Sequence, residues 1–402
     1  MAEYLRIGIT YYKKVKKPKI SGELITVILP WSRQVIIDDH GKGFLEDIEK
    51  YEGFIVIPSH VNYQQAINNF YNRYMALDHD LNLEFTEGSI PNTLNFMNHI
   101  FGDQIEIGLD YLSIIWKKPT QILPILCLVS NDRNTGKTTF LNWLNMIFQD
   151  NMTMNTNEDF RSRFNADWSE KLIIGVDEVL LDRKEDSERI KNLSTTKTNK
   201  LESKGKDKLP HEFFGKIILC SNNEDSFILL DDKEIRYWVR KISTLNIVDP
   251  DLEIKLKKEI PYFVAYLNSR KIKSPNETRM WFSKEQIHTL ALDNLIKGTK
   301  ANLEKELLSI IDDKIEDFEL EEINFTVSEL KELVRGSSYI TPEFKIKEIV
   351  EKNWNLISDN SSYYEYYKSI IPGTNDWEIS RNNKKGRFFT FKKEFIKGLL
   401  NC

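Results

Sequence analysis

The sequence predicts an α/β fold with a mostly parallel sheet, a small β-rich region before it and a helical, winged-helix-like module after it. Between residues 111 and 272, short apolar strands alternate with helix-like segments, which is the pattern of a parallel sheet covered on both faces. Residues 1–60 alternate apolar and polar positions, as half-buried strands do. After residue 273, helical segments lead to a short aromatic strand pair. We therefore expect domains at 1–60, 61–110, 111–272 and 273–402.

The composition is that of a soluble globular chain with more than one domain. The 402 residues are 41% hydrophobic and 29% charged, and they exceed what one small core organises. The cysteines Cys127, Cys220 and Cys402 lie too far apart to indicate a disulfide framework or a zinc site. The net charge of −5 excludes a surface that is basic throughout, although basic residues on one loop suffice to bind DNA. No signal peptide or membrane span is visible, so we expect a cytoplasmic protein without a membrane partner.

The first two regions carry no catalytic pattern. In residues 1–60 the runs LRIGITYY, ELITVILPW, QVIIDD and GFIVIP are strand-like, which indicates a docking or oligomerisation module. Over residues 61–110 the period becomes helical, as in QQAINNFYNRYMAL and LNFMNHIFG. We expect a helical collar there.

The strongest motif is SNDRNTGKTTF, residues 130–140, between an apolar strand and a helix. Gly136, Lys137 and Thr138 match the second half of a phosphate loop, in which the lysine binds the β- and γ-phosphates and the hydroxyl binds Mg²⁺. Asn131 stands where the first glycine is usual, and asparagine enters positive φ readily, so we expect the turn to persist. The alternative is a chance GKT at a helix start. The expected ATP-binding residues are Asn131, Asp132, Arg133, Asn134, Thr135, Gly136, Lys137, Thr138 and Thr139.

Two later strands end in polar side chains. KLIIGVDEVLLD ends in Asp177, expected to hold Mg²⁺, and Glu178, expected to orient and deprotonate the attacking water. The pair follows Lys137 by forty residues, as neighbouring strands of one site would, although an acidic pair alone is more often a helix cap. KIILCSNN ends in Asn222, whose amide could reach the γ-phosphate. Alone, SNN is an ordinary turn, and its place after the other two strands is what makes Asn222 a sensor candidate.

The segment DDKEIRYWVR supplies two arginines, Arg236 and Arg240. An arginine that reaches the γ-phosphate of a neighbouring subunit would stabilise the charge of phosphoryl transfer. We assign this role to Arg236 before Arg240. The alternative is a salt-bridging arginine at a strand edge.

A lysine-rich loop lies between the acidic strand and Asn222, in STTKTNKLESKGKDKLPHEFFGK. Its Lys-Gly-Lys sequence predicts the tip of a hairpin. Six copies in a ring would line a channel with positive charge and hold DNA phosphates without reading bases. A solvated lysine loop is the alternative. The residues expected to bind DNA are Lys204, Lys206 and Lys208, flanked by Lys197 and Lys200.

Taken together, SNDRNTGKTTF, LIIGVDEV, the lysine loop and IILCSNN resemble the superfamily 3 helicases, in particular the D5-like primase-helicases of phages and large DNA viruses. The resemblance covers about residues 71–267 and is most specific to the helicase part of bacteriophage primase-helicase proteins. It implies an AAA+ P-loop fold, a hexameric ring, ATP with Mg²⁺ at subunit interfaces and 3′→5′ movement on single-stranded DNA. The sequence departs from the pattern at Asn131, and residues 1–70 hold no primase centre, so a primase partner would be a separate chain.

The C-terminal region loosely resembles the winged helices that follow viral helicases. Arg381, Lys384, Lys385 and Arg387 surround the expected wing in SRNNKKGRFF, and a solvated turn is the alternative.

These features predict an ATP-dependent DNA helicase for replication of a phage or mobile element, acting on single-stranded and forked DNA. A translocating ATPase without unwinding, for packaging or defence, would show the same motifs. A replication-initiation scaffold clamped by ATP would keep Lys137 but could dispense with Glu178. A small-molecule kinase would need an arginine-rich lid and an acceptor pocket, and neither is visible.

Overall fold

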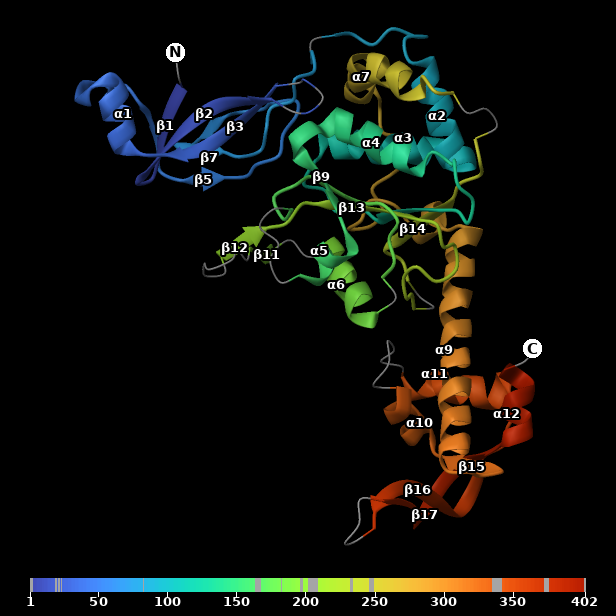
Figure 1. Ribbon diagram of the computed structural model, residues 1–402. Helices are drawn as coiled ribbons and strands as arrows, with labels where there is room; N and C mark the ends of the chain where they lie inside the picture. Colours follow the sequence, from blue (N-terminus) through green and yellow to red (C-terminus); the bar gives the residue numbers. More distant parts are fainter. Residues whose placement is uncertain are drawn as a thin grey trace.

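The structure is a computed structural model that places three units in chain order: a β-rich N-terminal unit, a central parallel sheet between helices, and a C-terminal unit at the far end of one long helix (Figure 1). It describes residues 3–18, 20, 22, 24–81, 83–162, 168–181, 183–195, 198–201, 209–231, 234–245, 249–334, 342–371 and 376–400.

The central sheet confirms the predicted α/β fold. Its five strands are all parallel, in the order β14-β8-β13-β10-β9. They are β8 (Ile125–Val129), β9 (Met152–Asn155), β10 (Ile173–Val176), β13 (Lys216–Ser221) and β14 (Tyr237–Lys241). The expectation that the loop strand β8 and the acidic strand β10 are neighbours is wrong, because β13, the third site strand along the chain, pairs with both. All three strands still end at the same edge of the sheet.

Helices cover both faces of the sheet (Figure 1). The helices on one face are α2 (Pro91–Phe101), α3 (Ile105–Lys117), α4 (Lys137–Phe148) and α7 (Leu252–Ser269). Those on the other are α5 (Asn157–Arg161), α6 (Lys184–Thr195) and the start of α9 (Leu290–Asp317). Strand β8 shows the division, since Leu126 and Leu128 belong to the first core while Cys127 and Val129 belong to the second. Short elements connect them: η2 (Gly102–Gln104), η3 (Gln149–Asn151) and α8 (Lys284–Ile287). A separate hairpin is formed by β11 (Thr198–Leu201) and β12 (Leu209–Glu212).

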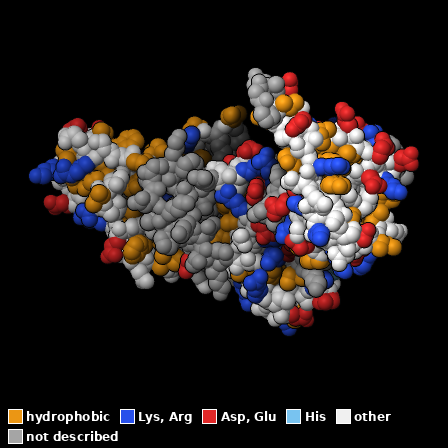
Figure 2. All heavy atoms as spheres, turned by 90° about the horizontal axis from the view of Figure 1, so that it is seen from below, with side chains coloured by type: hydrophobic (Ala, Val, Ile, Leu, Met, Phe, Trp, Pro, Cys, Tyr) orange, Lys and Arg blue, Asp and Glu red, His pale blue; other side chains and the backbone are white. Residues whose placement is uncertain are grey.

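Basic and acidic side chains are interspersed on the face of the molecule seen in Figure 2, without a broad area of one charge. This agrees with the small net charge of −5. On this face, a surface that binds nucleic acid would therefore be local. Within the described ranges, no helix combines the length and apolarity needed to cross a membrane.

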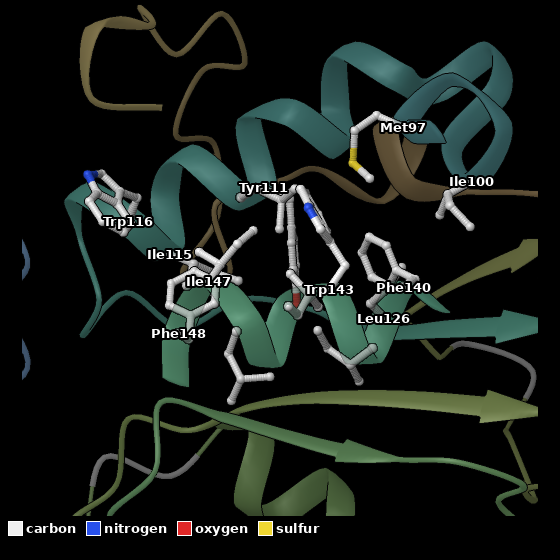
Figure 3. Packing of buried hydrophobic residues seen from close by; sticks show 14 of the residues in the cluster. Met97, Ile100, Tyr111, Ile115, Trp116, Leu126, Phe140, Trp143, Ile147 and Phe148 are labelled. Atoms are coloured by element: carbon white, nitrogen blue, oxygen red, sulfur yellow. The ribbon is translucent and has the colours of Figure 1, made fainter. Parts of the chain in front are cut away.

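Large aromatic side chains fill the core above the sheet (Figure 3). Trp143 of α4 is fully buried and lies 5.9 Å from Phe140 and 5.0 Å from Phe263, measured between ring centroids. Tyr111 of α3 is also fully buried in this core. Each such side chain contributes roughly 2–3 kcal/mol of burial free energy. The core thereby fixes α4, and with it the loop that precedes this helix.

A buried carboxylate locks α3 to the end of α7. Asp110 is fully buried and accepts hydrogen bonds from Arg270 Nη2 (3.0 Å), from Ser274 N–H (2.7 Å) and from Lys273 N–H (3.0 Å). We expect Asp110→Asn to lower the free energy of unfolding by about 3 kcal/mol, because Arg270 loses its buried counter-ion. Asp103→Asn, at an exposed carboxylate paired with Arg240, should cost less than about 1 kcal/mol. Equal urea midpoints for the two variants would contradict the prediction.

The N-terminal unit is β-rich, as predicted. Its strands form two sheets, β3-β2-β1-β4 and β5-β7-β6. The strands are β1 (Glu3–Ile7), β2 (Thr10–Pro18), β3 (Leu24–Trp31), β4 (Glu49–Tyr51), β5 (Phe54–Ile55), β6 (Ala66–Ile67) and β7 (Phe70–Asn72). The run QVIIDD, expected as a strand, is instead helix α1 (Arg33–His40), followed by η1 (Lys42–Leu45). The Ser32 hydroxyl accepts the N–H of Gln34 at 3.2 Å, and this cap favours the helix.

The prediction of helical structure from residue 61 onward is wrong for the residues that precede α2. The segment QQAINNFYN forms strands β6 and β7, which pair antiparallel around Asn68 and Asn69. Both asparagines have positive φ, 45° and 63°. Such consecutive residues form the tight turns of two-residue hairpins. The apolar spacing there is thus that of a hairpin, and the helical part begins at Pro91.

Helix α9 connects the central sheet to the C-terminal unit, and its first half packs on the sheet through Leu292 and Leu295. Its second half, from Leu303 to Ile315, belongs to the C-terminal core. The unit also contains β15 (Glu322–Phe325), α10 (Val327–Val334), α11 (Glu343–Glu348), the π-helical turn η4 (Ile349–Asn353), β16 (Asp359–Ile370), β17 (Trp377–Lys392) and α12 (Lys393–Leu400). The strand pair is longer than expected, with twelve paired positions between β16 and β17. We call this pair the C-terminal ribbon.

Candidate nucleotide-binding site

Three predicted motifs meet at the carboxyl edge of the sheet. The Thr138 hydroxyl donates a hydrogen bond of 2.7 Å to Asp177 Oδ2, which joins the start of α4 to the end of β10. Asn222 Nδ2, after β13, lies 3.5 Å from Glu178 Oε1. The structure therefore brings together, from three separate strand–loop units, the predicted residues Thr138, Asp177, Glu178 and Asn222.

The loop between β8 and α4 reverses at Asn134 and Gly136, which have φ of 56° and 85°. The expectation that Asn131 takes the positive φ is wrong. Asn131 instead fastens the loop sideways: its N–H donates to Glu224 Oε1 (2.9 Å), and its side-chain oxygen accepts the N–H of Glu224 (3.2 Å). An asparagine can make this reciprocal pair and a glycine cannot, because glycine has no side-chain acceptor.

Helix α2 closes the loop from one side. A Cβ added at Gly136 would lie 3.1 Å from the Phe96 ring, so both the positive φ and the close approach favour glycine. The His99 ring is hydrogen-bonded to the carbonyl of Thr135 at 2.9 Å. Neither Phe96 nor His99 was predicted as a site residue, since both lie about one helix away from any motif.

Lys137 lies inside the loop and is 6% exposed. Its Nζ lies 3.1 Å from Thr135 Oγ1 and 3.4 Å from the carbonyl oxygens of Ser130 and Asp132. Burial lowers the pKa of this ammonium, and the nearby Cys220 and Asp177 partly oppose the shift. No described carboxylate forms an ion pair with it, so an anion that enters the loop would be its first full counter-charge.

Glu178 has a strained backbone, with φ of 51°. Positive φ in a residue with a long side chain costs of order 1 kcal/mol and persists only where neighbouring contacts hold it. Here the Val179 N–H donates to the Cys220 carbonyl (2.8 Å), and the Ser221 hydroxyl donates to the Val179 carbonyl (2.9 Å). Strand β13 thus fixes the turn that carries the Glu178 carboxylate.

A cation that no sequence motif indicates closes the loop from the other side. Lys241, at the end of β14, pairs with Glu224 at 2.7 Å, and the Leu245 N–H donates to the Asn134 carbonyl at 3.1 Å. Burial raises the pKa of Glu224, but the hydrogen bonds from Lys241 and Asn131 outweigh it and lower that pKa. Strand β14 reaches this edge beside β8, and no local spacing in the sequence indicates that pairing.

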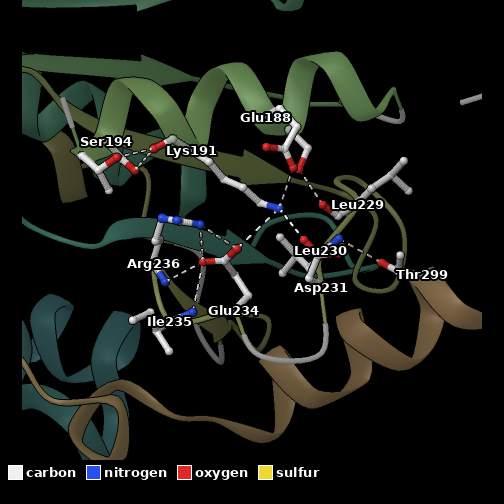
Figure 4. A network of polar contacts seen from close by, with 12 residues as sticks. Glu188, Lys191, Ser194, Leu229, Leu230, Asp231, Glu234, Ile235, Arg236 and Thr299 are labelled. Carbon is white, nitrogen blue, oxygen red and sulfur yellow. Dashed lines mark hydrogen bonds and ion pairs between the residues drawn. The ribbon is translucent and has the colours of Figure 1, made fainter. Parts of the chain in front are cut away.

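The structure does not bring Arg236 to Lys137 within one chain. Arg236 precedes β14 at the opposite edge of the sheet, where its carbonyl accepts the N–H of Ile125, the first residue of β8. Its side chain pairs with buried Glu234 (3.2 Å), which also lies 3.5 Å from Lys191 of α6 (Figure 4). A role of Arg236 in a neighbouring subunit's site stays a prediction.

Arg240 has local partners. It donates to Gln104 Oε1 (2.9 Å) and pairs with Asp103 (2.9 Å), which ties β14 to the connection between α2 and α3. These contacts give Arg240 a structural role, in line with the preference for Arg236.

The predicted hairpin exists, and its lysines Lys204, Lys206 and Lys208 lie outside the described residues. Strands β11 and β12 pair antiparallel from Thr198 opposite Glu212 to Leu201 opposite Leu209. Strand β12 ends at Glu212 and β13 begins at Lys216, so the hairpin leaves the sheet at its amino-terminal edge. The nucleotide-site candidates and the hairpin therefore lie at opposite edges, and Figure 1 shows the hairpin on the side of the sheet away from α9.

The donor set suits Mg²⁺. Magnesium typically takes one or two protein oxygens and completes its shell with water and phosphate. Thr138 and Asp177 offer a hydroxyl and a carboxylate in contact. In the described part of the chain, no group of three or more His, Cys, Asp and Glu side chains could hold a metal by itself.

Comparisons with known proteins found a similar fold over nearly the whole chain. Residues 128–237 match a family of unknown function, DUF5906, and no curated protein matches the sequence significantly. The apo structure of the C-terminal region of NrS-1 is similar, with a TM-score of 0.58 and 14% identity, covering 96% of this chain and 95% of that one. An A-form apo structure of the same region has a TM-score of 0.57 and 16% identity, covering 87% and 82%. The N-terminal and C-terminal units thus belong to an architecture that the two proteins share.

Proposed function

We propose that the protein is an ATP-dependent DNA helicase of the superfamily 3 type, with an AAA+ P-loop core, that acts in replication of a phage or mobile element. The hydrogen bond between Thr138 and Asp177 is the observation that carries this proposal. It joins the two predicted Mg²⁺ ligands beside a buried lysine without a carboxylate partner among the described residues. The resemblance of the motifs to bacteriophage primase-helicase proteins supports the same function.

Each side chain has one role in the proposed reaction. The N–H groups of residues 133–139 bind the phosphates at the start of α4, where the helix dipole favours anions, while the Asn131 N–H holds Glu224. Lys137 neutralises the β- and γ-phosphates. Thr138 and Asp177 would hold Mg²⁺, which supplies charge neutralisation during phosphoryl transfer. Glu178 takes the proton of the attacking water, and the Asn222 amide, 3.5 Å from this carboxylate, orients it.

Hydrolysis at a subunit interface explains the place of Arg236. Because this arginine lies at the edge of the sheet opposite Lys137, it serves the site of a neighbouring subunit. Its partner Glu234 also meets Lys191 on α6, a helix that follows the acidic pair and ends just before β11. In a hexameric ring, α6 would therefore connect hydrolysis at Glu178 with the DNA-facing hairpin and with the arginine.

The proposal is tested by ATP hydrolysis with and without single-stranded DNA, alongside strand separation on a forked duplex. Stimulated hydrolysis with unwinding in the 3′→5′ direction is the expected result. Hydrolysis without strand separation would favour a translocating ATPase. Binding of ATP without hydrolysis would favour the clamped scaffold.

Neutralising the hairpin should weaken the grip on single-stranded DNA. We expect the triple variant Lys204→Gln, Lys206→Gln, Lys208→Gln to reduce the slope of log affinity against log salt by about 2, at roughly 0.7 per lost phosphate contact. The double variant Lys16→Gln, Lys17→Gln alters exposed lysines of β2 and serves as the charge control. Fluorescence anisotropy at several salt concentrations measures the slope. The same slope in both variants would remove the hairpin from the DNA path.

A further inference from the structure

The C-terminal ribbon separates its charges between two faces. Directly paired residues share a face, and so do residues two apart along a strand. One face carries the acidic residues Asp359, Glu365 and Glu378. The other face carries no acidic residue at any of its twelve paired positions, which are Asn360, Ser362, Tyr364, Tyr366, Lys368, Ile370, Trp377, Ile379, Arg381, Asn383, Lys385 and Arg387. We call this second set the basic face.

The acidic face belongs to the fold of the C-terminal unit. Tyr363 donates to Glu329 of α10 at 2.9 Å, and Lys384 pairs with Glu329 (3.1 Å) and Glu365 (2.6 Å). Lys384, predicted as a basic residue of the wing, is therefore neutralised and does not join its neighbour Lys385 on the basic face. The hydrogen bonds that the Lys384 ammonium donates to Glu365 and Glu329 raise the pKa of Lys384.

Three of the four cations on the basic face lack an ion-pair partner among the described residues. Arg381, Lys385 and Arg387 are exposed, and none of them has an ion-pair partner among the described residues. Elsewhere in the C-terminal unit, Lys331, Lys352 and Lys397 pair with glutamates. At one end of the face, Lys368 pairs with Asp317, and Tyr366, opposite Arg381, packs against Phe318. The free part of the face is therefore the β17 side, from Arg381 to Arg387. Cations that a fold leaves unpaired in a row favour an anionic partner.

The shape of the ribbon selects the partner. A two-stranded ribbon fits the major groove of B-DNA, which is about 12 Å wide. From Arg381 to Arg387 the row extends for roughly 20 Å, at about 3.3 Å per residue. Asn383, Asn360 and Ser362 lie between the cations and can bond to base edges or phosphates. The Arg381 guanidinium lies 4.3 Å from the centroid of the Tyr364 ring and covers one side of it, so this side is not open for the base stacking on which single-strand surfaces depend.

We propose that the basic face of the C-terminal ribbon binds double-stranded DNA through Arg381, Lys385 and Arg387. Helix α9, which is 28 residues or roughly 42 Å long, separates the ribbon from the central sheet. The ribbon is thus a second DNA contact, distinct from the β11–β12 hairpin. In a helicase it would hold the duplex while the hairpins hold the single strand. The binding itself requires neither ATP nor hydrolysis.

The test measures binding of the full chain, without nucleotide, to a labelled duplex of 20 base pairs. We expect the triple variant Arg381→Gln, Lys385→Gln, Arg387→Gln to lose about tenfold or more in duplex affinity and about 2.7 in salt slope, at 0.9 per phosphate contact. Single-strand affinity, measured on an unpaired oligonucleotide, should change much less. Unchanged duplex binding would overturn the proposal, and so would a loss confined to the single strand. Circular dichroism verifies that the variant is folded.

Two adjacent asparagines supply a matched control. Asn383 lies on the basic face and Asn382 on the acidic face, and both are exposed. Asn383→Asp and Asn382→Asp add the same charge without changing the shape of the side chain. We expect only Asn383→Asp to weaken duplex binding, because its carboxylate would face the phosphates. Equal affinities in the two variants would overturn the proposal, even if the triple variant failed to fold. Since no step uses ATP, this result is independent of the helicase assay.

Discussion

Replacing Lys137 with alanine should reduce ATP hydrolysis by at least about a thousandfold, to background. The ammonium lies within the loop, between Thr135 Oγ1 and the Ser130 carbonyl, where phosphate oxygens would be its first full counter-charge. A water molecule that fills the space cannot supply this charge. Lys241, which contacts the loop through Glu224, is already paired with that carboxylate and does not replace the lost ammonium.

The measurement is steady-state phosphate release with saturating single-stranded DNA, with Lys241→Ala as the control at the same edge of the sheet. Lys241 is more than half exposed, so its loss should cost less than about tenfold. Thermal unfolding separates catalysis from folding: Lys137 is a buried cation with a lowered pKa, and its removal should not lower the melting temperature. Turnover retained in Lys137→Ala would exclude this loop as the site of hydrolysis.

Strands β8, β10 and β13 of the central sheet were predictable because they are short, fully buried and mostly apolar runs. Parallel strands end at one edge, so the polar residues after β8, β10 and β13 had to lie near one another. The contact between Thr138 and Asp177 follows from this rule. The order of the strands in the sheet could not be predicted from the same rule. The connection between β8 and β10 is long enough for β13, which comes later in the chain, to lie between them.

Local backbone conformation was the second feature that the sequence did not predict correctly. In the loop, the asparagine with positive φ is Asn134, and Asn131 instead forms hydrogen bonds with Glu224. Both roles suit asparagine, so its identity could not decide between them. At Asn68 and Asn69 the apolar spacing imitated a helix, while the two asparagines supplied a turn. In such short segments, residues that favour a tight turn decide the structure more strongly than the spacing of apolar residues does.

Several residues of the site come from outside every motif. Phe96 and His99 reach the loop from α2, and Lys241 reaches it from β14. Each is a single side chain whose position depends on tertiary packing, so the spacing of residues along the chain does not predict its place in the site. The same holds for the ribbon, where Lys384 and Lys385 are adjacent in sequence and differ only in the face they occupy.

Glu178→Gln should abolish turnover while leaving ATP bound. The substitution preserves the shape of the side chain, and the strained turn stays in place because Val179 remains hydrogen-bonded to Cys220 and Ser221. What is lost is the carboxylate that takes the proton of water, a contribution of roughly 10²–10⁴ in rate. The Asn222 amide, 3.5 Å from Glu178, can still bond to the glutamine oxygen.

The decisive comparison sets Glu178→Gln against Lys137→Ala in nucleotide binding and in hydrolysis. Both variants should fail to hydrolyse ATP, but Glu178→Gln should bind a fluorescent ATP analogue within about threefold of the unaltered chain, since neither Lys137 nor Thr138 changes. Lys137→Ala should bind it much more weakly. If Glu178→Gln retains turnover, the base must be another residue at this edge. If instead it loses binding, the Glu178 carboxylate itself helps to hold the metal with Asp177, because the substitution leaves unchanged the Glu178 N–H that donates to Asp177 Oδ1 at 3.0 Å.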